Sequence, residues 1–159
     1  MDTSDSKITF DDDGVCDHCS TFDMSISPNW HTGEKGKSDL EILSNKIKYD
    51  GRNKDFDCII GMSGGIDSSY LTYIAKCELK LRPLVFHVDC GWNTDQAVSN
   101  IEKLINGLNL DLYTDVIDWQ EVKDLQLAFL KSQIPDQDLV QDYAFFSSLY
   151  RFAKKNSIK

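Results

Sequence analysis

Apolar and polar residues follow two different rhythms along most of the chain. Short apolar runs typical of buried strands cover residues 56–62 and 84–88, and residues 110–117 alternate as a strand does. Between and after them, apolar residues recur at helical spacing. These segments predict helices over 66–77, from Thr94 to 108, from Asp118 to 130 and from 138 to 156. An earlier helix over 39–49 is predicted from Ser38, which caps it, and Glu41, which completes a capping box.

Strand, helix, strand, helix, strand and helix in that order predict an α/β fold, a parallel sheet with helices on both faces. Ligands bind such sheets outside the carboxyl ends of the strands. The loops after Met62, Val88 and Ile117 should therefore meet at one edge. The chain ends on 157–159, which resembles the first step into another strand, so we expect it to be the front part of a longer protein.

The first part of the chain has a different composition, rich in Asp, Ser, Thr and Gly. We therefore expect two parts, an N-terminal segment over 1–37 and the α/β domain over 38–159. Residues 7–10 are predicted as a short strand, 11–14 as a turn and 28–36 as a loop. Cys16 and Cys19 have the spacing of one half of a zinc ribbon, with a redox pair or no special role as alternatives.

Composition and charge narrow the classes of function. The chain has 159 residues, 41% of them hydrophobic, and a net charge of −9, so a globular domain is favoured and a nucleic-acid partner is disfavoured. No apolar run is long enough to span a bilayer, which argues against membrane insertion. The acidic N-terminus does not resemble a secretory signal, so the expected compartment is the cytoplasm. Five cysteines in such a chain do not predict a disulfide framework.

The turn between the first apolar run and the next helix carries the chemistry. Ser63, Gly64 and Gly65 bring backbone N–H groups to a helix N-terminus, where they can bind phosphate. Ser68 and Ser69 add hydroxyl groups at the same place, as Ser63 does. A carboxylate at Asp67 suits such a site when Mg²⁺ bridges it to the phosphates. A turn that serves packing alone is the alternative interpretation.

The turn lacks the Lys of nucleoside-triphosphate loops and the spacing of the dinucleotide fingerprint. The residues Ser63-Gly64-Gly65-Ile66-Asp67-Ser68 instead resemble the PP-loop of ATP pyrophosphatases, a Rossmann-like fold of the adenine nucleotide alpha hydrolase type. That family includes the synthetase parts of GMP and NAD synthesis and several tRNA-modifying enzymes. The resemblance implies ATP as cofactor, adenylation of a carbonyl oxygen and release of pyrophosphate, which the loop holds.

Three further segments, 8–19, 86–93 and 135–144, resemble the N-acetyl sugar amidotransferase family of surface-polysaccharide biosynthesis. The resemblance implies an enzyme that adenylates the acetamido group of a nucleotide-linked sugar, for lipopolysaccharide O-antigen or nonulosonate synthesis. Ammonia from a separate glutaminase subunit would displace AMP and give an acetamidino sugar. It also implies that the ligands missing from a Cys16 and Cys19 zinc site lie further along the protein.

Carried over by position, the resemblance assigns roles to particular residues. Ser63, Gly64, Gly65, Asp67 and Ser68 would hold pyrophosphate, with Mg²⁺ near Asp67. Val88 and Asp89 would lie near the adenosine, and Cys90 stands where the family often has Asn. Gln137, Asp138 and Asp142 would serve the sugar or the reacting centre, so the implied catalytic residues are Asp67, Gln137 and Asp138.

Two alternatives stay open at this point. A tRNA-modifying enzyme of the same superfamily would need a basic face, and a scaffold that keeps the fold without catalysis would bind no nucleotide.

His87 lies inside an apolar run, which favours a hydrogen-bonded core residue over a catalytic base.

Overall fold

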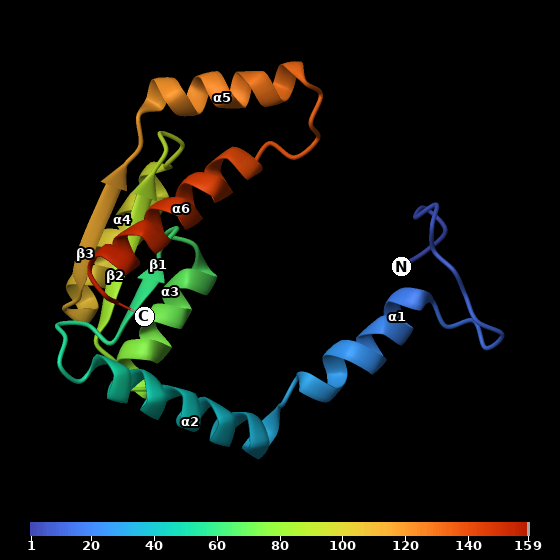
Figure 1. Cartoon of the computed structure of the whole chain (residues 1–159), viewed down its shortest axis with the longest axis horizontal. Coiled ribbons are helices and arrows are strands. Elements are labelled where there is room, and N and C mark those ends of the chain that lie inside the picture. Colours follow the sequence, from blue (N-terminus) through green and yellow to red (C-terminus); the bar gives the residue numbers. More distant parts are fainter. Residues whose placement is uncertain (159) are drawn as a thin grey trace. The chain divides into compact units, whose positions relative to one another are not determined.

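A computed structural model describes residues 1–158 (Figure 1). The chain forms two compact units that divide between Leu43 and Ser44, and each is described by itself. The division falls inside one helix, α2 (Gly33–Gly51), whereas the sequence places the border after residue 37.

The N-terminal unit is built from short elements. Phe10 and Cys16 form an isolated antiparallel bridge, and the predicted strand over 7–10 is wrong beyond that bridge. Asp11 holds the intervening turn, because its side chain accepts hydrogen bonds from the N–H groups of Asp13 and Val15. Three short helices follow: α1 (Asp17–Thr21), η1 (Phe22–Ile26) and η2 (Ser27–Asn29).

The start of α2 corrects two predictions. The helix begins at Gly33, so part of the predicted loop over 28–36 is helical, and Ser38 lies inside the helix rather than at its cap. Glu34 in the first turn suits the positive end of the helix dipole, and its carboxylate pairs with Lys37 at 2.7 Å. His31 Nδ1 also bonds Asp39 Oδ2 at 2.5 Å. These contacts outweigh the local signal of a capping box.

The second unit contains a parallel sheet of three strands in the order β1-β2-β3, which confirms the predicted α/β class. The strands are β1 (Cys58–Gly61), β2 (Pro83–Asp89) and β3 (Asp111–Val116). The crossover from β1 to β2 contains α3 (Ile66–Tyr73) and a wider turn, η3 (Ile74–Glu78), and α4 (Asp95–Leu108) connects β2 to β3. In parallel strands the carboxyl ends, at Gly61, Asp89 and Val116, share one edge.

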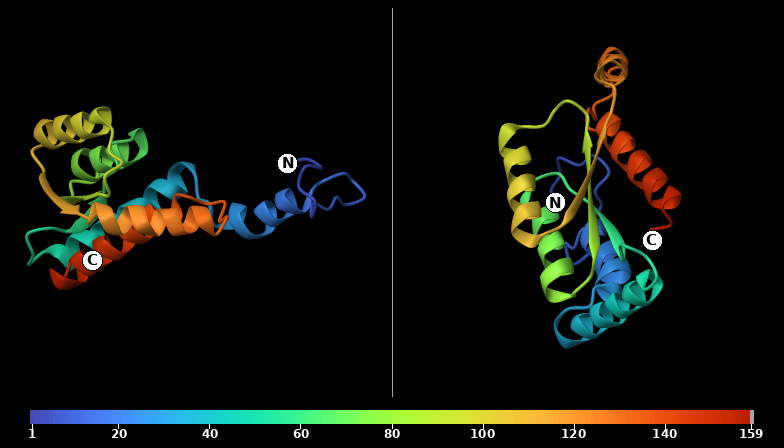
Figure 2. Two further views of the ribbon diagram at one scale, coloured as in Figure 1. Left: turned by 90° about the horizontal axis from the view of Figure 1, so that it is seen from above. Right: turned by 90° about the vertical axis from the view of Figure 1, so that its left-hand side faces the viewer.

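Helices cover both faces of this sheet, as Figure 2 shows: α3 and α4 lie on one side and α6 (Leu139–Lys155) on the other. The central strand β2 is buried from Pro83 to Val88, and its successive side chains serve opposite faces. Val85 packs with Met62 and with Ile101 of α4. Phe86 and Val88 pack on the other face, with Val122 of α5 (Trp119–Lys131) and Val140 of α6.

Local signals explain why these helices begin where they do. Thr94 caps α4 by accepting a hydrogen bond from the Ala97 N–H, and Asp118 caps α5 by accepting from the N–H groups of Gln120 and Glu121. Both caps agree with the sequence analysis. Within residues 1–158, no helix is long and apolar enough to cross a bilayer.

Candidate functional site

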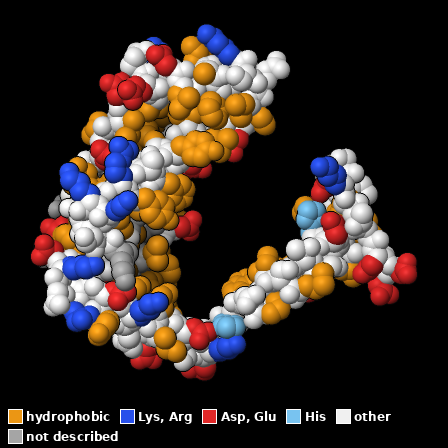
Figure 3. Space-filling view, in the orientation of Figure 1, with side chains coloured by type: hydrophobic (Ala, Val, Ile, Leu, Met, Phe, Trp, Pro, Cys, Tyr) orange, Lys and Arg blue, Asp and Glu red, His pale blue; other side chains and the backbone are white. Residues whose placement is uncertain are grey.

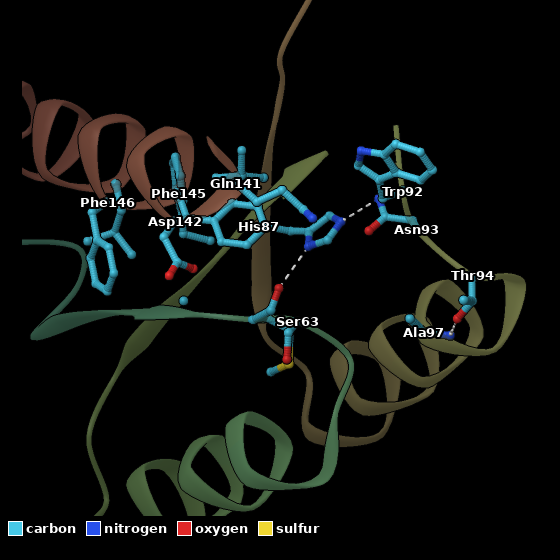
Figure 4. Close-up of a pocket in the computed structure, with 15 residues that line it drawn as sticks. Ser63, His87, Trp92, Asn93, Thr94, Ala97, Gln141, Asp142, Phe145 and Phe146 are labelled. Atoms are coloured by element: carbon cyan, nitrogen blue, oxygen red, sulfur yellow. Dashed lines mark hydrogen bonds between the residues drawn. The ribbon is translucent and has the colours of Figure 1, made fainter. Parts of the chain in front are cut away.

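A cavity of about 510 Å³ opens at the carboxyl edge of the sheet (Figure 4). Its floor is the end of β1 and β2, and its walls come from the loop after β2, the start of α4 and the first half of α6. The residues that line it are Gly61, Met62, Ser63, Phe86, His87, Val88, Trp92, Asn93, Thr94, Ala97, Gln141, Asp142, Phe145, Phe146 and Leu149. This is the place where open α/β sheets bind ligands, and the volume suits a small organic molecule.

The turn from β1 to α3 enters this cavity at Ser63 and is pressed against α4. Gly64 has φ +78°, and a Cβ there would lie 2.5 Å from the carbonyl oxygen of Ala97. Its own carbonyl accepts a hydrogen bond from Asn100 Nδ2 at 3.0 Å. Both the backbone conformation and the close approach require glycine at this position.

Hydroxyl groups close the turn from inside. Ser63 Oγ lies 3.1 Å from Ser68 Oγ and accepts a hydrogen bond from the Gly65 N–H at 3.3 Å. The Ser63 N–H donates to Ser68 Oγ, also at 3.3 Å. Ser69 Oγ donates to the Gly65 carbonyl at 2.7 Å. The serines therefore hold the turn in one conformation before any ligand arrives.

The first turn of α3, which starts at Ile66, leaves backbone N–H groups without partners inside the helix. Together with the helix dipole they favour a negatively charged group at this end. Asp67 is exposed in the same turn, so its carboxylate is open to solvent and to a cation.

The opposite wall is organised by a buried histidine. His87 is 7% exposed, its Nδ1 lies 2.7 Å from the Met62 carbonyl oxygen and its Nε2 lies 3.0 Å from Asn93 Nδ2 (Figure 4). Both ring nitrogens are thus engaged, which agrees with the expected hydrogen-bonded core residue. Through these two hydrogen bonds, His87 connects Met62, which precedes the Ser63–Ser69 turn, to Asn93 in the loop after β2.

That loop is fixed from its other side by α5. The rings of Trp92 and Trp119 meet edge to face with centroids 5.2 Å apart, and Trp92 Nε1 donates to Gln126 Oε1 at 3.1 Å. Gly91, with φ +84°, lies so close to Trp119 that a Cβ would come within 2.6 Å of its ring. The cavity wall is therefore a packed structure.

The structure places the predicted residues unevenly around the cavity. Ser63 and Val88 line it, and Gly64, Gly65, Asp67, Ser68 and Ser69 form the adjoining turn and the first turn of α3. The Asp89 carboxylate instead accepts a hydrogen bond from the Gly91 N–H at 2.8 Å. Asp142, on α6, also lines the cavity.

Gln137 and Asp138 do not line the cavity. Gln137 Nε2 donates to the Ile134 carbonyl at 2.7 Å, and the Gln137 carbonyl accepts from Gln126 Nε2 at 3.4 Å. Within the described part of the chain, Gln137 Oε1 is buried without a hydrogen-bond partner. Asp138 immediately precedes α6, and over residues 1–158 its side chain makes no cap bond to that helix. Gln137 therefore bonds within the connection between α5 and α6, in which Asp138 also lies.

Sequence reasoning assigned no site role to Asn93 or Gln141, which line the cavity from the β2 loop and from α6. The signal for Asn93 was its position just after a buried strand, where ligand contacts concentrate. Gln141 had no such signal, because its place on the wall depends on how α6 packs against the sheet. Phe145, also on α6, lines the cavity as well.

Asp142 is the one ionisable carboxylate among the described residues that line the cavity, and no Lys or Arg is among them. Cys90 lies beside the floor and is buried. Burial raises the pKa of its thiol, and the carboxylates of Asp89 and Asp115 raise it further. The thiol stays protonated at neutral pH, so nucleophilic chemistry by Cys90 is disfavoured.

Metal ligands differ between the two units. Mg²⁺ is held by one or two carboxylates together with substrate phosphates, so the exposed Asp67 beside serine hydroxyls fits a cation that arrives with a nucleotide. A structural zinc needs four ligands. Among residues 1–158 no group of three or more His, Cys, Asp and Glu could hold a metal, so Cys16 and Cys19 offer half of a zinc site at most.

The cysteine pair also has internal asymmetry. The Cys19 backbone N–H, and then its thiol, donate toward Cys16 and lower the pKa of the Cys16 thiol. The bond between the two side chains raises the pKa of the Cys19 thiol. Cys16 is buried and Cys19 is exposed, and both are free thiols.

Comparison with known proteins gave no matching family model and no significant match among curated proteins. Among solved structures, NMN synthetase from Francisella tularensis matches with a TM-score of 0.54 and 22% identity, over 80% of this chain and 53% of that chain. An NH3-dependent NAD synthetase from Campylobacter jejuni gives 0.49 and 20%, over 74% and 52%. An NAD+ synthetase from Burkholderia pseudomallei gives 0.48 and 16%, over 80% and 61%.

The match to the NMN synthetase shows that this chain shares the fold of that protein. The chain spans between about half and three fifths of the lengths of these proteins.

Proposed function

We propose that this chain carries the nucleotide-binding part of an ATP-dependent amidotransferase that forms AMP and pyrophosphate. The observation that carries the proposal is the Ser63–Ser69 turn, closed by its own hydroxyl groups at the N-terminus of α3 and opening on the cavity. The turn resembles the PP-loop, and NAD synthesis is among the activities of that family. A fold shared with an NMN synthetase supports the same interpretation.

The proposed reaction has two steps. The carbonyl oxygen of an acetamido group attacks the α-phosphorus of ATP, the bond to pyrophosphate breaks, and the amide nitrogen gives up its proton to solvent, which leaves an O-adenylyl imidate. Ammonia then adds to the imidate carbon, and the carbon–oxygen bond breaks to release AMP and leave an acetamidino group. An amide is a poor electrophile, and adenylation makes its oxygen a good leaving group.

Residue roles follow from position. The N–H groups at the start of α3, with Ser63, Gly64, Gly65, Ser68 and Ser69, bind the pyrophosphate portion. Val88 lies at the floor beside the nucleoside, and Asp89 shapes the adjoining loop. Mg²⁺, when bound, neutralises phosphate charge, and Asp67 is the carboxylate that would hold it.

The substrate class is the finer part of the proposal. The resemblance of segments 8–19, 86–93 and 135–144 to N-acetyl sugar amidotransferases supports a nucleotide-linked N-acetyl sugar and a glutaminase partner that supplies ammonia. Asp142 lines the cavity and is the acidic residue that would contact that sugar. Gln137 and Asp138 keep a proposed supporting role through the loop that leads into α6.

The first test is calorimetric titration of the chain with Mg·ATP and with Mg·pyrophosphate. Wild type is expected to bind both, and Asp67→Ala is expected to bind each about tenfold more weakly or worse, a change of roughly 1.4 kcal/mol. Glu102→Ala, which removes one exposed carboxylate from α4, is the matched control and should bind as wild type does.

Three results would contradict the proposal. Failure of wild type to bind either ligand would favour a scaffold that keeps the fold without the nucleotide. Formation of ADP, rather than AMP, in an assay with sugar and ammonia would exclude the proposed chemistry. Tight, salt-sensitive binding of bulk tRNA would instead favour the tRNA-modifying alternative.

A further inference from the structure

We infer that Asn93 is a specificity-determining residue of the cavity, and that His87 sets the orientation of its amide. Asn93 then presents its carbonyl oxygen to the bound ligand and selects a nucleoside that carries a hydrogen-bond donor at that point. The inference rests on the proposed function, because it assigns the nucleoside end of the same site.

The first step is the bond between His87 and Met62. A backbone carbonyl oxygen only accepts hydrogen bonds, and Met62 O lies 2.7 Å from His87 Nδ1. The proton of a neutral imidazole therefore resides on Nδ1. His87 is 7% exposed, so the ring is confined between β1 and the loop after β2.

The second step follows from the tautomer. With the proton on Nδ1, Nε2 carries a lone pair and must accept a hydrogen bond. Its partner at 3.0 Å is the side-chain amide of Asn93, and the NH₂ group, not the oxygen, is the half of that amide that can donate. The fixed carbonyl of Met62 thus determines, through His87, which end of the Asn93 amide faces the histidine.

The third step concerns the remaining end. Because Nδ2 bonds His87 (Figure 4), Asn93 Oδ1 is the end of the amide that is left for another partner, and Asn93 lines the cavity. The neighbouring hydroxyl oxygens each accept a backbone hydrogen bond, Thr94 Oγ1 from the Ala97 N–H and Ser63 Oγ from the Gly65 N–H, and their O–H groups can act as donors. Asn93 Oδ1 is an oriented acceptor for a donor from the ligand.

A nucleoside offers such donors. Ser63 and Asn93 line the same cavity, Ser63 at the phosphate-binding turn and Asn93 on the loop after β2. A ligand whose phosphates lie on the turn therefore brings its ribose hydroxyls or an exocyclic amine toward Asn93. A site built to accept a hydrogen bond from such a group discriminates strongly against an analogue that lacks it.

The experiment is a comparison of four nucleotides by calorimetry with the 159-residue chain: ATP, 2′-deoxy-ATP, 3′-deoxy-ATP and the 6-desamino analogue. Wild type should bind one analogue about tenfold or more weakly than ATP. Asn93→Ala should bind ATP as weakly as wild type binds that analogue, and should no longer distinguish the two. Affinity for Mg·pyrophosphate, which reaches only the turn, should stay within about twofold.

Variants at position 87 test the orienting role. His87→Gln has one donor and one acceptor, so it can bond both Met62 O and Asn93 and should keep most of the discrimination. His87→Leu should reduce discrimination while circular dichroism still reports a folded chain. Asn106→Ala, an exposed amide at the far end of α4, is the matched control and should change nothing.

The outcomes separate the inference from the proposed function. If wild type binds ATP and pyrophosphate but treats all three analogues like ATP, or if Asn93→Ala keeps the discrimination, the role of Asn93 is wrong and the nucleotide site stands. Loss of pyrophosphate affinity equal to the loss of ATP affinity in Asn93→Ala also overturns it. If wild type binds no nucleotide, both the role of Asn93 and the proposed function are wrong.

Discussion

At the scale of single residues, the turn after β1 shows how backbone geometry precedes chemistry. Gly64 combines a positive φ with a close approach to Ala97, so the turn can lie against α4 only without a side chain at that point. Ser63 and Ser68 then add hydrogen bonds that a larger residue at Gly64 would displace. The proposed phosphate binding at this site would therefore depend on one glycine that need not touch the ligand.

Replacement of that glycine gives a direct prediction. Gly64→Ala forces its Cβ to 2.5 Å from the Ala97 carbonyl, and α4 or the turn must move. We expect a loss of about 1–3 kcal/mol in the free energy of unfolding, measured in urea, and a loss of Mg·pyrophosphate binding.

Gly107→Ala is the control for that substitution. Gly107 lies in α4, and a Cβ added there would meet no neighbouring atom of the described residues within 4 Å. Alanine at this position should therefore stabilise the helix by about 0.5–1 kcal/mol. Equal stability of the two variants would show that the Gly64 turn is not pressed against α4 in solution.

At the scale of elements, α5 supports the cavity without lining it. Its first residue, Trp119, packs on Gly91 and Trp92, and Gln126, further along the helix, holds the Trp92 indole N–H. The loop that carries Asn93 is therefore positioned by a neighbouring helix. The start of α5 depends on Asp118, whose Oδ1 accepts from the Gln120 N–H at 2.7 Å and the Glu121 N–H at 3.2 Å.

Removal of this cap should loosen the loop. Asp118→Ala is expected to lower the free energy of unfolding by about 1 kcal/mol, because two N–H groups lose their acceptor, whereas Asp118→Asn should cost far less. Urea denaturation measures the stability, and fluorescence quenching of the tryptophans measures the exposure of Trp92 and Trp119. Identical behaviour of the alanine and asparagine variants would contradict the capping role.

At the scale of the sheet-containing unit, one ion pair joins three segments. The Asp57 carboxylate is 4% exposed and lies 2.6 Å from Arg82 Nη2. Arg82 also donates to the carbonyls of Gly51 and Lys54, so it links the end of α2 to the entrances of β1 and β2.

Apolar side chains remain exposed on the same unit, notably Tyr143, Phe146 and Tyr150 of α6, and Figure 3 shows such side chains gathered over α5 and α6.

The ion pair predicts how stability depends on pH. Burial alone raises the pKa of Asp57, but the hydrogen bonds and the charge of Arg82 outweigh it and leave the pKa below its ordinary value. The stabilisation is therefore present above the unfolded pKa of about 3.9 and is lost as the pH falls through the lower folded pKa.

Asp57→Asn should lower the free energy of unfolding at pH 7 by roughly 2–4 kcal/mol, because Arg82 loses its charged partner. The variant should also lose less stability than wild type when urea denaturation is repeated between pH ~5 and pH ~3. Asp55→Asn, at an exposed position two residues earlier, should stay within about 0.5 kcal/mol of wild type. Parallel pH curves for wild type and Asp57→Asn would exclude this role.

The elements that the sequence predicted well have strong local causes. The apolar runs around Ile60 and Val85 can only be buried strands, and the caps Thr94 and Asp118 act on neighbouring N–H groups, so periodicity and spacing are sufficient to find them. The helix start at Ser38 was wrong because Glu34 and the His31–Asp39 contact extend α2 to Gly33. The capping box at Ser38 is a local signal, and it did not account for a contact between residues eight positions apart.

By itself, the sequence determined the α/β class, the order of the elements and the position of the glycine- and serine-rich turn after β1, since each depends on residues close together in the chain. Tertiary structure alone decided which side chains share the cavity. Gln137 and Asp138 do not line it, whereas Asn93 does, beside His87, whose hydrogen-bond partner Met62 lies 25 residues earlier. The packing of α6 and the loop after β2 against the sheet brings distant residues together, and no short-range pattern encodes that packing.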